Sequence, residues 1–308
     1  MTIRTIGLIG TDSSHATVFT ELLNDPEHRL HVPGFRVTAA WPGGSPDFPL
    51  SASRVDAIMG RLEAERGVAR LDSPEQVAAS CDALMLLSID GRERVRLFER
   101  IAPYGKPVFI DKPLALGERD AAALIGAAEL HRTPIFSASA LRYAIGRRGA
   151  ASGPLPARER IARADVRGPL QVEPTQSIYY WYGIHLAEML FELLGSECES
   201  VRAERRGDHD LLIGQWTGGR VGTAYCDCSG DYRFEAACST AEGNRHAIAI
   251  EPDMTISYAR LVADIASFFA TGIAPVPAGE TRAAIRFLEA AELSLSSGQV
   301  SVPLNVVL

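Results

Sequence analysis

The stretch Val108-Phe109-Ile110-Asp111-Lys112-Pro113 is the part of the sequence from which the fold is most readily deduced. Residues 107–110 read as a short buried strand, and an acid, a lysine and a proline follow at once. Proline biases the residue before it toward extended geometry, so Lys112 is expected at the exit of the strand. In an open parallel sheet, the carboxyl ends of the strands face the ligand crevice. A lone Lys-Pro pair is more often a surface feature than a site, so its surroundings must decide.

The sequence on both sides of this stretch alternates strands with helices. Apolar strand patterns cover residues 5–10, 35–41, 82–88, 107–110 and 134–138, and helical patterns cover residues 16–23, 54–65, 92–102 and 118–130. The continuous apolarity of residues 82–88 indicates burial on both faces, as in a parallel sheet. This alternation predicts an α/β fold whose first domain, residues 1–140, is a doubly wound Rossmann parallel sheet.

The pattern changes after residue 140. Residues 146–156 have the composition of a linker, and a strong helix at residues 184–194 ends at Gly195. Strand-like runs follow one another at residues 161–166, 200–203, 211–216, 221–226 and 232–237, with a hairpin signal at Gly218-Gly219. Helices at residues 258–269 and 280–294 close the chain. Residues 141–308 are therefore expected to form a second α/β domain with a mostly antiparallel open sheet.

Composition limits the possible functions. A chain of 308 residues is long enough for two domains. The net charge of −7 argues against binding to nucleic acid or to an anionic membrane. Five cysteines, odd in number and unevenly spaced, fit a reducing cytoplasm better than a disulfide framework. The first residues show no signal-peptide layout and no apolar run is long enough to span a bilayer, so we expect a cytoplasmic protein.

The turn after the first strand has part of a dinucleotide-binding signature. A strand, a glycine turn and a helix N-terminus form the usual pyrophosphate cradle. The fingerprint G-x-G-x-x-G falls on Gly10, Asp12 and His15, so only the first glycine is present. Asp12 brings a negative charge to the place where backbone normally approaches the phosphates. Ser13, Ser14 and the helix N-terminus could still supply donors, with Asp12 turned away as an N-cap.

The end of the second strand also departs from the signature. Trp41-Pro42 stands where an acid would bind the ribose of NAD. The segment Gly43-Gly44-Ser45 could accommodate a 2′-phosphate, or it could be only a turn. This motif alone leaves dinucleotide binding open.

Several segments in a fixed order carry a family resemblance. They are the Gly67-Val68 turn, Asp72-Ser73-Pro74-Glu75, residues 81–88, residues 104–108, Asp111-Lys112-Pro113-Leu114-Ala115-Leu116 and residues 182–188, which read YGIHLAE. Their order and spacing resemble the Gfo/Idh/MocA family, the glucose–fructose oxidoreductase and inositol dehydrogenase-like enzymes. The resemblance implies a Rossmann domain, and a second domain whose open sheet packs beside the nicotinamide and often serves in oligomerisation. It thereby implies a homo-oligomer, a dimer or a tetramer.

The resemblance also implies roles for individual residues. Lys112 matches the lysine of a Glu-Lys-Pro motif, with Asp111 for the glutamate, and would help to hold and deprotonate a substrate hydroxyl. His185 matches the histidine of a D-x-G-x-H-x-x-D motif and would be the acid/base residue. The first acid of that motif is replaced by Trp181 and the last by Glu188, which could orient His185 from the same helical face.

The remaining candidates have less specific signals. The expected cofactor-binding residues are Gly10, Thr11, Asp12, Ser13, Ser14, Ser45, Ser88, Asp111 and Lys112, and the expected substrate-binding residues are Arg142, Tyr143, Tyr182 and Glu188. Arg142 could pair with a substrate carboxylate or be solvated. The aromatic run that contains Tyr182 could line a dry pocket or be core. His15 is expected to have a structural or phosphate-side role, and no metal site is expected.

These observations together predict an NAD(P)-dependent oxidoreductase that acts on CH–OH groups. The substrate would be a small hydroxylated or carbonyl compound, of which sugar-like compounds are one option, and the preference for NAD or NADP stays open. Two alternatives remain. One is a non-redox lyase or hydrolase in which the nicotinamide cycles without release. The other is a degenerate, non-catalytic ligand-binding protein, which Asp12 and Trp181 favour.

Overall fold

The computed structural model describes residues 4–145 and 155–306. By its contacts the chain divides into two compact units. The first unit comprises Met1–Ala115, Asp120–Ala138 and Tyr258–Ala278, and the second comprises Leu116–Arg119, Ser139–Ser257 and Gly279–Leu308. Most of the predicted linker, residues 146–154, lies outside the described residues.

The first unit contains a six-stranded sheet with the order β3-β2-β1-β4-β5-β6, and every strand pair in it is parallel. The strands are β1 (Arg4–Ile9), β2 (Phe35–Trp41), β3 (Ala69–Arg70), β4 (Ala83–Leu86), β5 (Val108–Ile110) and β6 (Ile135–Phe136). Every residue of β4 and β5 is buried, which explains their uninterrupted apolar sequence. The predicted Rossmann sheet is thus confirmed, with β1 between β2 and β4.

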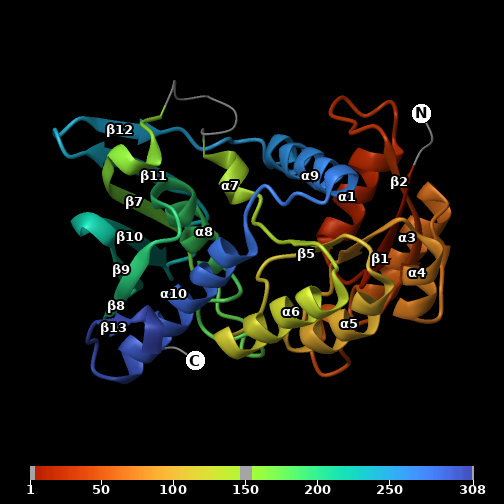
Figure 1. Cartoon of the computed structure of the whole chain (residues 1–308), viewed down its shortest axis with the longest axis horizontal. Coiled ribbons are helices and arrows are strands. Elements are labelled where there is room, and N and C mark those ends of the chain that lie inside the picture. Colours follow the sequence, from red (N-terminus) through yellow and green to blue (C-terminus); the bar gives the residue numbers. More distant parts are fainter. Residues whose placement is uncertain (1–3, 146–154, 307–308) are drawn as a thin grey trace. The chain divides into compact units, whose positions relative to one another are not determined.

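Helices cover this sheet. They are α1 (Ser14–Asn24), α2 (Pro49–Ala52), α3 (Val55–Arg66), α4 (Pro74–Ser80), α5 (Arg94–Ile101), most of α6 (Glu118–His131) and most of α9 (Met254–Thr271). A division of the chain at residue 140 assigns α9 to the second half, yet α9 packs with the first unit. The ring of Phe268 lies 5.7 Å from that of Phe136 on β6, and Phe269 lies 5.8 Å from Phe35 on β2. In Figure 1, α9 runs beside α1.

The second unit contains a seven-stranded sheet with the order β12-β11-β7-β10-β9-β8-β13. The strands are β7 (Ile161–Pro169), β8 (Cys198–Arg206), β9 (His209–Trp216), β10 (Arg220–Asp227), β11 (Glu235–Thr240), β12 (Arg245–Ile248) and β13 (Val302–Pro303). Only β7 and β10 pair in parallel, so the predicted, mostly antiparallel sheet is confirmed. The hairpin predicted at Gly218-Gly219 joins β9 to β10, and both glycines have positive φ. The short edge strands β12 and β13 were not predicted.

Helix α8 (Gly183–Leu194) crosses this sheet against β7 and β10, and all of its residues are buried. The ring of Phe191 on α8 lies 5.4 Å from that of Trp216 on β9 and 5.9 Å from that of Phe287 on α10 (Ala278–Ser296). Gly222 leaves room for the indole, since a Cβ there would lie 2.7 Å from the Trp216 ring. This packing fixes α8, whose first turn carries His185. None of the helices in residues 4–145 and 155–306 is long and apolar enough to cross a membrane.

Candidate functional site

The turn after β1 is built on Gly10. Its φ is 91°, and a Cβ there would lie 2.6 Å from the backbone nitrogen of Ser88, so only glycine lets the exits of β1 and β4 approach this closely. The N–H groups of Gly10 and Thr11 donate to the carbonyls of Trp41 and Pro42, both at 2.9 Å. These two donors are therefore committed to the loop after β2.

The first turn of α1 follows this loop. Ser13 is the N-cap, and its Oγ accepts from the N–H of His15 at 3.1 Å. The hydroxyl of Thr11 donates to the carbonyl of Val55 at 3.1 Å, whereas Ser14 is exposed. A helix N-terminus carries unpaired N–H groups and partial positive charge, which suits a phosphate. Of the serines and the threonine predicted in this turn, Ser14 is the one placed to meet a ligand directly.

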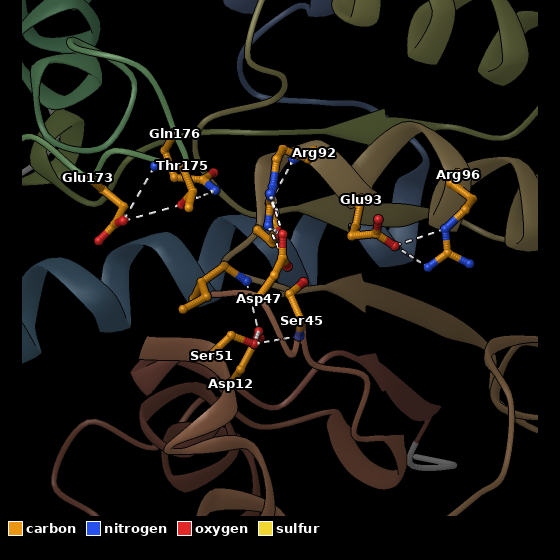
Figure 2. A network of polar contacts seen from close by, with 12 residues as sticks. Asp12, Ser45, Asp47, Ser51, Arg92, Glu93, Arg96, Glu173, Thr175 and Gln176 are labelled. Atoms are coloured by element: carbon orange, nitrogen blue, oxygen red, sulfur yellow. Dashed lines mark hydrogen bonds and ion pairs between the residues drawn. The ribbon is translucent and has the colours of Figure 1, made fainter. Parts of the chain in front are cut away.

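Asp12 is fully buried and turned away from solvent. Its Oδ2 accepts from Ser51 Oγ at 2.6 Å and its Oδ1 from the Ile89 N–H at 3.1 Å, while the Ser45 N–H donates to Ser51 Oγ at 2.8 Å (Figure 2). The sequence left open that Asp12 turns away from the phosphate site as the N-cap of α1. Its carboxylate does turn away, but the N-cap is Ser13. Burial raises the pKa of Asp12, although Ser51 and Ile89 lower it. Asp12 thus links the turn after β1 to Ser51 of α2 and to Ile89 after β4. Because both of its oxygens are engaged there, it is compatible with a phosphate at the N-terminus of α1.

A second, outer link involves Arg92 (Figure 2). Its Nη1 and Nη2 donate to the Asp47 carboxylate at 2.8 and 2.9 Å, and its Nε and Nη2 donate to Asp90 at 2.9 and 2.7 Å. Hydrogen bonds to Asp90 and Asp47 raise the pKa of Arg92 above its usual value. Asp47 follows β2 and Arg92 follows β4, so this ion pair joins the loops on either side of β1. No sequence motif pointed to it.

The exit of β5 is fixed by a buried arginine that the sequence analysis missed. Arg94 is 1% exposed, and its Nη1 donates to the carbonyl of Asp111. Its Nη2 donates to the carbonyls of Ser88 at 3.1 Å and Lys112 at 3.2 Å. Burial lowers the pKa of Arg94 to about 10, against nearby aspartates that raise it. One side chain thereby holds the ends of β4 and β5 and positions the half-buried Lys112, whose bond to Pro113 is cis.

Asp111 is engaged by His15. The His15 Nδ1 lies 2.8 Å from Asp111 Oδ2, and both side chains are buried. The Lys112 N–H donates to Asp111 Oδ1 at 2.8 Å. Burial raises the pKa of Asp111, but His15, Lys112 and Arg94 together lower it to about 2. His15 therefore has a structural role at the Lys112 strand, which is one of the two roles expected for it.

In the second unit, His185 is held by a serine. Its Nδ1 lies 2.6 Å from the Oγ of the fully buried Ser139, which also accepts from the Leu141 N–H at 3.0 Å. The rings of Tyr182 and Phe234 meet His185 edge-on at 5.5 and 6.2 Å. Burial raises the pKa of Tyr182. The imidazole is thus held at Nδ1 by a buried hydroxyl.

Glu188 supports His185 through Ser139. The Glu188 Oε2 accepts from the Ser139 N–H at 2.9 Å and from Arg142 Nε at 2.6 Å. Arg142 Nη1 also donates to Glu192 at 3.1 Å and to Glu280 at 2.7 Å. Arg142 is therefore neither solvated nor open to a substrate carboxylate through these two nitrogens. Burial lowers the pKa of Arg142, but the three glutamates raise it above its usual value, and burial raises that of Glu188.

Other predicted features are placed as follows. Tyr143 is 2% exposed in α7 (Leu141–Ala144). None of the five cysteines forms a disulfide, and among the described residues no group of three or more His, Cys, Asp or Glu side chains could hold a metal ion.

The two units have a Rossmann-type parallel sheet and a second, mostly antiparallel open sheet. No protein-family profile matches the sequence, and no curated protein matches it. Solved structures do. An oxidoreductase from Agrobacterium radiobacter in complex with NAD+, L-tartaric acid and magnesium is 14% identical with a TM-score of 0.75, and 100% of each chain is covered.

Two inositol dehydrogenases have the same fold. Myo-inositol dehydrogenase from Lactobacillus casei, in complex with NAD(H) and myo-inositol, is 15% identical with a TM-score of 0.73, over 98% of this chain and 97% of that one. Myo-inositol dehydrogenase from Corynebacterium glutamicum ATCC 13032 is 14% identical with a TM-score of 0.74, over 99% of both chains. The fold expected from the Gfo/Idh/MocA resemblance is confirmed.

Proposed function

We propose that the protein is an NAD(P)-dependent oxidoreductase that acts on a CH–OH group of a small hydroxylated or carbonyl compound, with sugar-like polyols as the first substrates to test. The observation that carries this proposal is the position of Lys112. It follows β5, beside the exit of β4, and Arg94 holds it there. A lysine at the carboxyl end of a Rossmann strand lies at the edge where such sheets bind ligands.

The chain's own residues fit a dinucleotide. The exposed Ser14, in the helix N-terminus that follows the tight Gly10 turn, would hold the pyrophosphate. Buried Asp12 offers no obstacle, since its oxygens are directed at Ser51 and Ile89. The fold shared with an NAD(H)-bound inositol dehydrogenase supports this assignment. When bound, the nicotinamide would accept or donate the hydride.

The protein would handle the proton of the reacting oxygen. In this proposal Lys112 and His185 handle that proton, and Ser139 holds the imidazole of His185 at Nδ1. Tyr182, edge-on to His185, would shield the reacting atoms from water. Glu188 and Arg142 would be positioning residues that act through Ser139.

A thermal-shift screen with NAD, NADH, NADP and NADPH tests the cofactor assignment. We expect at least one dinucleotide to raise the Tm, because a ligand that binds only the folded state stabilises it. Polyols are then tested with that dinucleotide, and a change in the absorbance of the reduced nicotinamide identifies a substrate. With it, Lys112→Ala should abolish turnover while dinucleotide binding persists. No Tm change with any of the four, or full turnover by Lys112→Ala, would contradict the proposal.

We also propose a cytoplasmic homo-oligomer. Five cysteines without a disulfide suit a reducing compartment, and the open sheet offers a surface for a second copy of the chain. Light scattering coupled to size exclusion should give the mass of a dimer or a tetramer, and a monomer would contradict this part.

A further inference from the structure

The segment that leads into α8, residues 177–182, is held by a carboxylate on another helix. Glu292 of α10 accepts hydrogen bonds at Oε1 from successive residues of this segment. The donors are Ser177 Oγ at 2.7 Å, the Ile178 N–H at 3.0 Å and the Tyr179 N–H at 3.3 Å. Ser177 has a φ of 67°, in the left-handed region that residues other than glycine rarely adopt. Such a conformation is strained and persists only where its surroundings enforce it, and Glu292 supplies that constraint.

Tyr179 is held at its side chain as well. The residue is fully buried, and its hydroxyl donates to Asp210 Oδ2 at 2.8 Å. Arg205 donates to the two oxygens of the same carboxylate at 2.9 and 2.8 Å, which keeps Asp210 in place. Burial and the Asp210 charge raise the pKa of Tyr179, so its hydroxyl stays protonated and remains a donor. Glu292 therefore fixes the main chain of Tyr179, and Asp210 fixes its ring.

The first turn of α8 is joined to this fixed tyrosine. The Tyr179 carbonyl accepts from the Ile184 N–H at 2.9 Å, and a Cβ on Gly183 would lie 3.1 Å from the Tyr179 Cβ. The N-cap residue of α8, Tyr182, makes no side-chain capping hydrogen bond. The N–H groups of a first helical turn need such partners from outside the helix. The start of α8, where His185 lies, is thus anchored by Tyr179.

We propose that Glu292 is a positioning residue of the candidate active site, which holds the His185 imidazole in place through Tyr179 and the first turn of α8. This inference rests on the proposed role of His185 in proton handling and adds a residue of α10 to that site. Ser139 holds the imidazole itself, at Nδ1. Glu292 holds the backbone from which the imidazole projects.

NMR of the protein labelled at histidine tests this role without a substrate. His185 is one of seven histidines, and its imidazole resonances are assigned by comparison with His185→Gln. Glu292→Ala should move these resonances, because the segment that it releases ends at Tyr182, whose ring lies 5.5 Å from that of His185. Glu292→Gln keeps an oxygen that can accept from the same N–H groups, so its His185 resonances should stay close to those of the wild type.

Turnover and cofactor affinity are the second readout. Glu292→Ala should lower kcat about tenfold or more, because a misplacement of about 1 Å can cost about 100-fold in rate. Glu292→Gln should restore most of kcat. The Kd of the dinucleotide should not change, since the residues proposed to hold it lie in the first unit. A merely structural role would lower the Tm but leave kcat and the His185 resonances of the folded protein unchanged.

Two further variants complete the test. Glu289, on the same helix, accepts from the N–H of Glu118 at 2.6 Å, so Glu289→Ala removes a similar hydrogen bond and should leave the His185 resonances unchanged. Tyr179→Phe keeps the ring and removes only the hydroxyl that Asp210 binds. It should move the His185 resonances, which covers the case that Glu292→Ala fails to fold.

The outcomes separate this inference from the proposed function. Unmoved His185 resonances in Glu292→Ala, or in Tyr179→Phe if the first variant does not fold, would overturn the role of Glu292 and leave the oxidoreductase proposal standing. Moved resonances with an unchanged kcat would overturn it as well. If the resonances move but the wild type binds no dinucleotide, the proposed function falls, and Glu292 still positions His185.

Discussion

Arg94 in the first unit and Arg142 in the second are each only 1% exposed, yet they are paired in opposite ways. Arg94 donates to the backbone carbonyls of three residues that end β4 and β5. Arg142 donates to three carboxylates, those of Glu188, Glu192 and Glu280. Burial therefore lowers the pKa of Arg94 to about 10, while in Arg142 the carboxylates outweigh burial and raise it.

The comparison separates two ways of building a site. In the first unit the guanidinium of Arg94 binds backbone carbonyl groups, and these hydrogen bonds position Lys112. Such carbonyl groups are present whatever side chains the residues carry. In the second unit the guanidinium of Arg142 neutralises glutamates that would otherwise be unpaired charges in the core. One of them, Glu188, accepts a hydrogen bond from the Ser139 N–H, and Ser139 Oγ in turn contacts His185. Loss of Arg142 should therefore lower the free energy of unfolding by more than loss of Arg94.

The largest effect is expected for Arg142→Leu. It leaves Glu188, Glu192 and Glu280 buried, and among the described residues Arg158 remains to pair with the last two, at 2.9 and 3.1 Å. Breaking a buried ion cluster in this way costs about 3–5 kcal/mol. Urea unfolding measures the loss. Arg61→Ala, which removes an exposed pair with Glu65, is the matched control and should cost less than about 1 kcal/mol. A loss no larger than that of the control would contradict the proposed charge balance.

Arg94→Lys should have a smaller effect of about 2–3 kcal/mol, because a lysine keeps the charge but cannot reach all three carbonyls in the planar geometry of a guanidinium. No buried carboxylate is left unpaired by the change. The displaced Lys112 backbone should also lower turnover once a substrate is known. If Arg94→Lys destabilises as much as Arg142→Leu in the same urea experiment, the distinction between the two arginines is wrong.

Residue types and spacing were enough to predict the two sheets, the Lys112 strand exit and His185 on α8. They did not predict the partners of these residues, since Arg94 and Asp111 are 17 positions apart, Asp47 and Arg92 are 45 apart, and Ser139 and His185 are 46 apart. Only the strand order brings such pairs together. A buried arginine also has no local signature, because arginine at a helix start is usually solvated. The strands β12 and β13, of four and two residues, are too short for a periodic pattern.

The His15–Asp111 pair of the first unit should make stability depend on acidity. The folded-state pKa of Asp111, about 2, lies below the value of about 3.9 for an unfolded aspartate. Its contribution, roughly 2 kcal/mol, is therefore present above about pH 4 and is lost as the pH falls toward 2. Subtracting the unfolding free energies of Asp111→Asn from those of the wild type across this range isolates the residue from other acids. A difference that does not change with pH would contradict the assignment.

The smallest effect on stability is expected at Ser139, which lies between Glu188 and His185. Ser139→Ala removes the Oγ partner of Nδ1 but keeps the backbone N–H that Glu188 accepts, so stability should fall by less than about 1.5 kcal/mol. Hydrogen-bond partners that orient metal-ligating histidines are worth about 10- to 100-fold in activity, and on the same scale kcat should fall about tenfold here. Ser139→Thr keeps the hydroxyl and should restore most of the rate. The acid limb of the kcat–pH profile should move in the alanine variant alone, because only that variant changes the hydrogen bond of the imidazole. Equal rates and equal profiles for both variants would mean that Ser139 serves packing, and that His185 is not oriented through the Arg142 cluster.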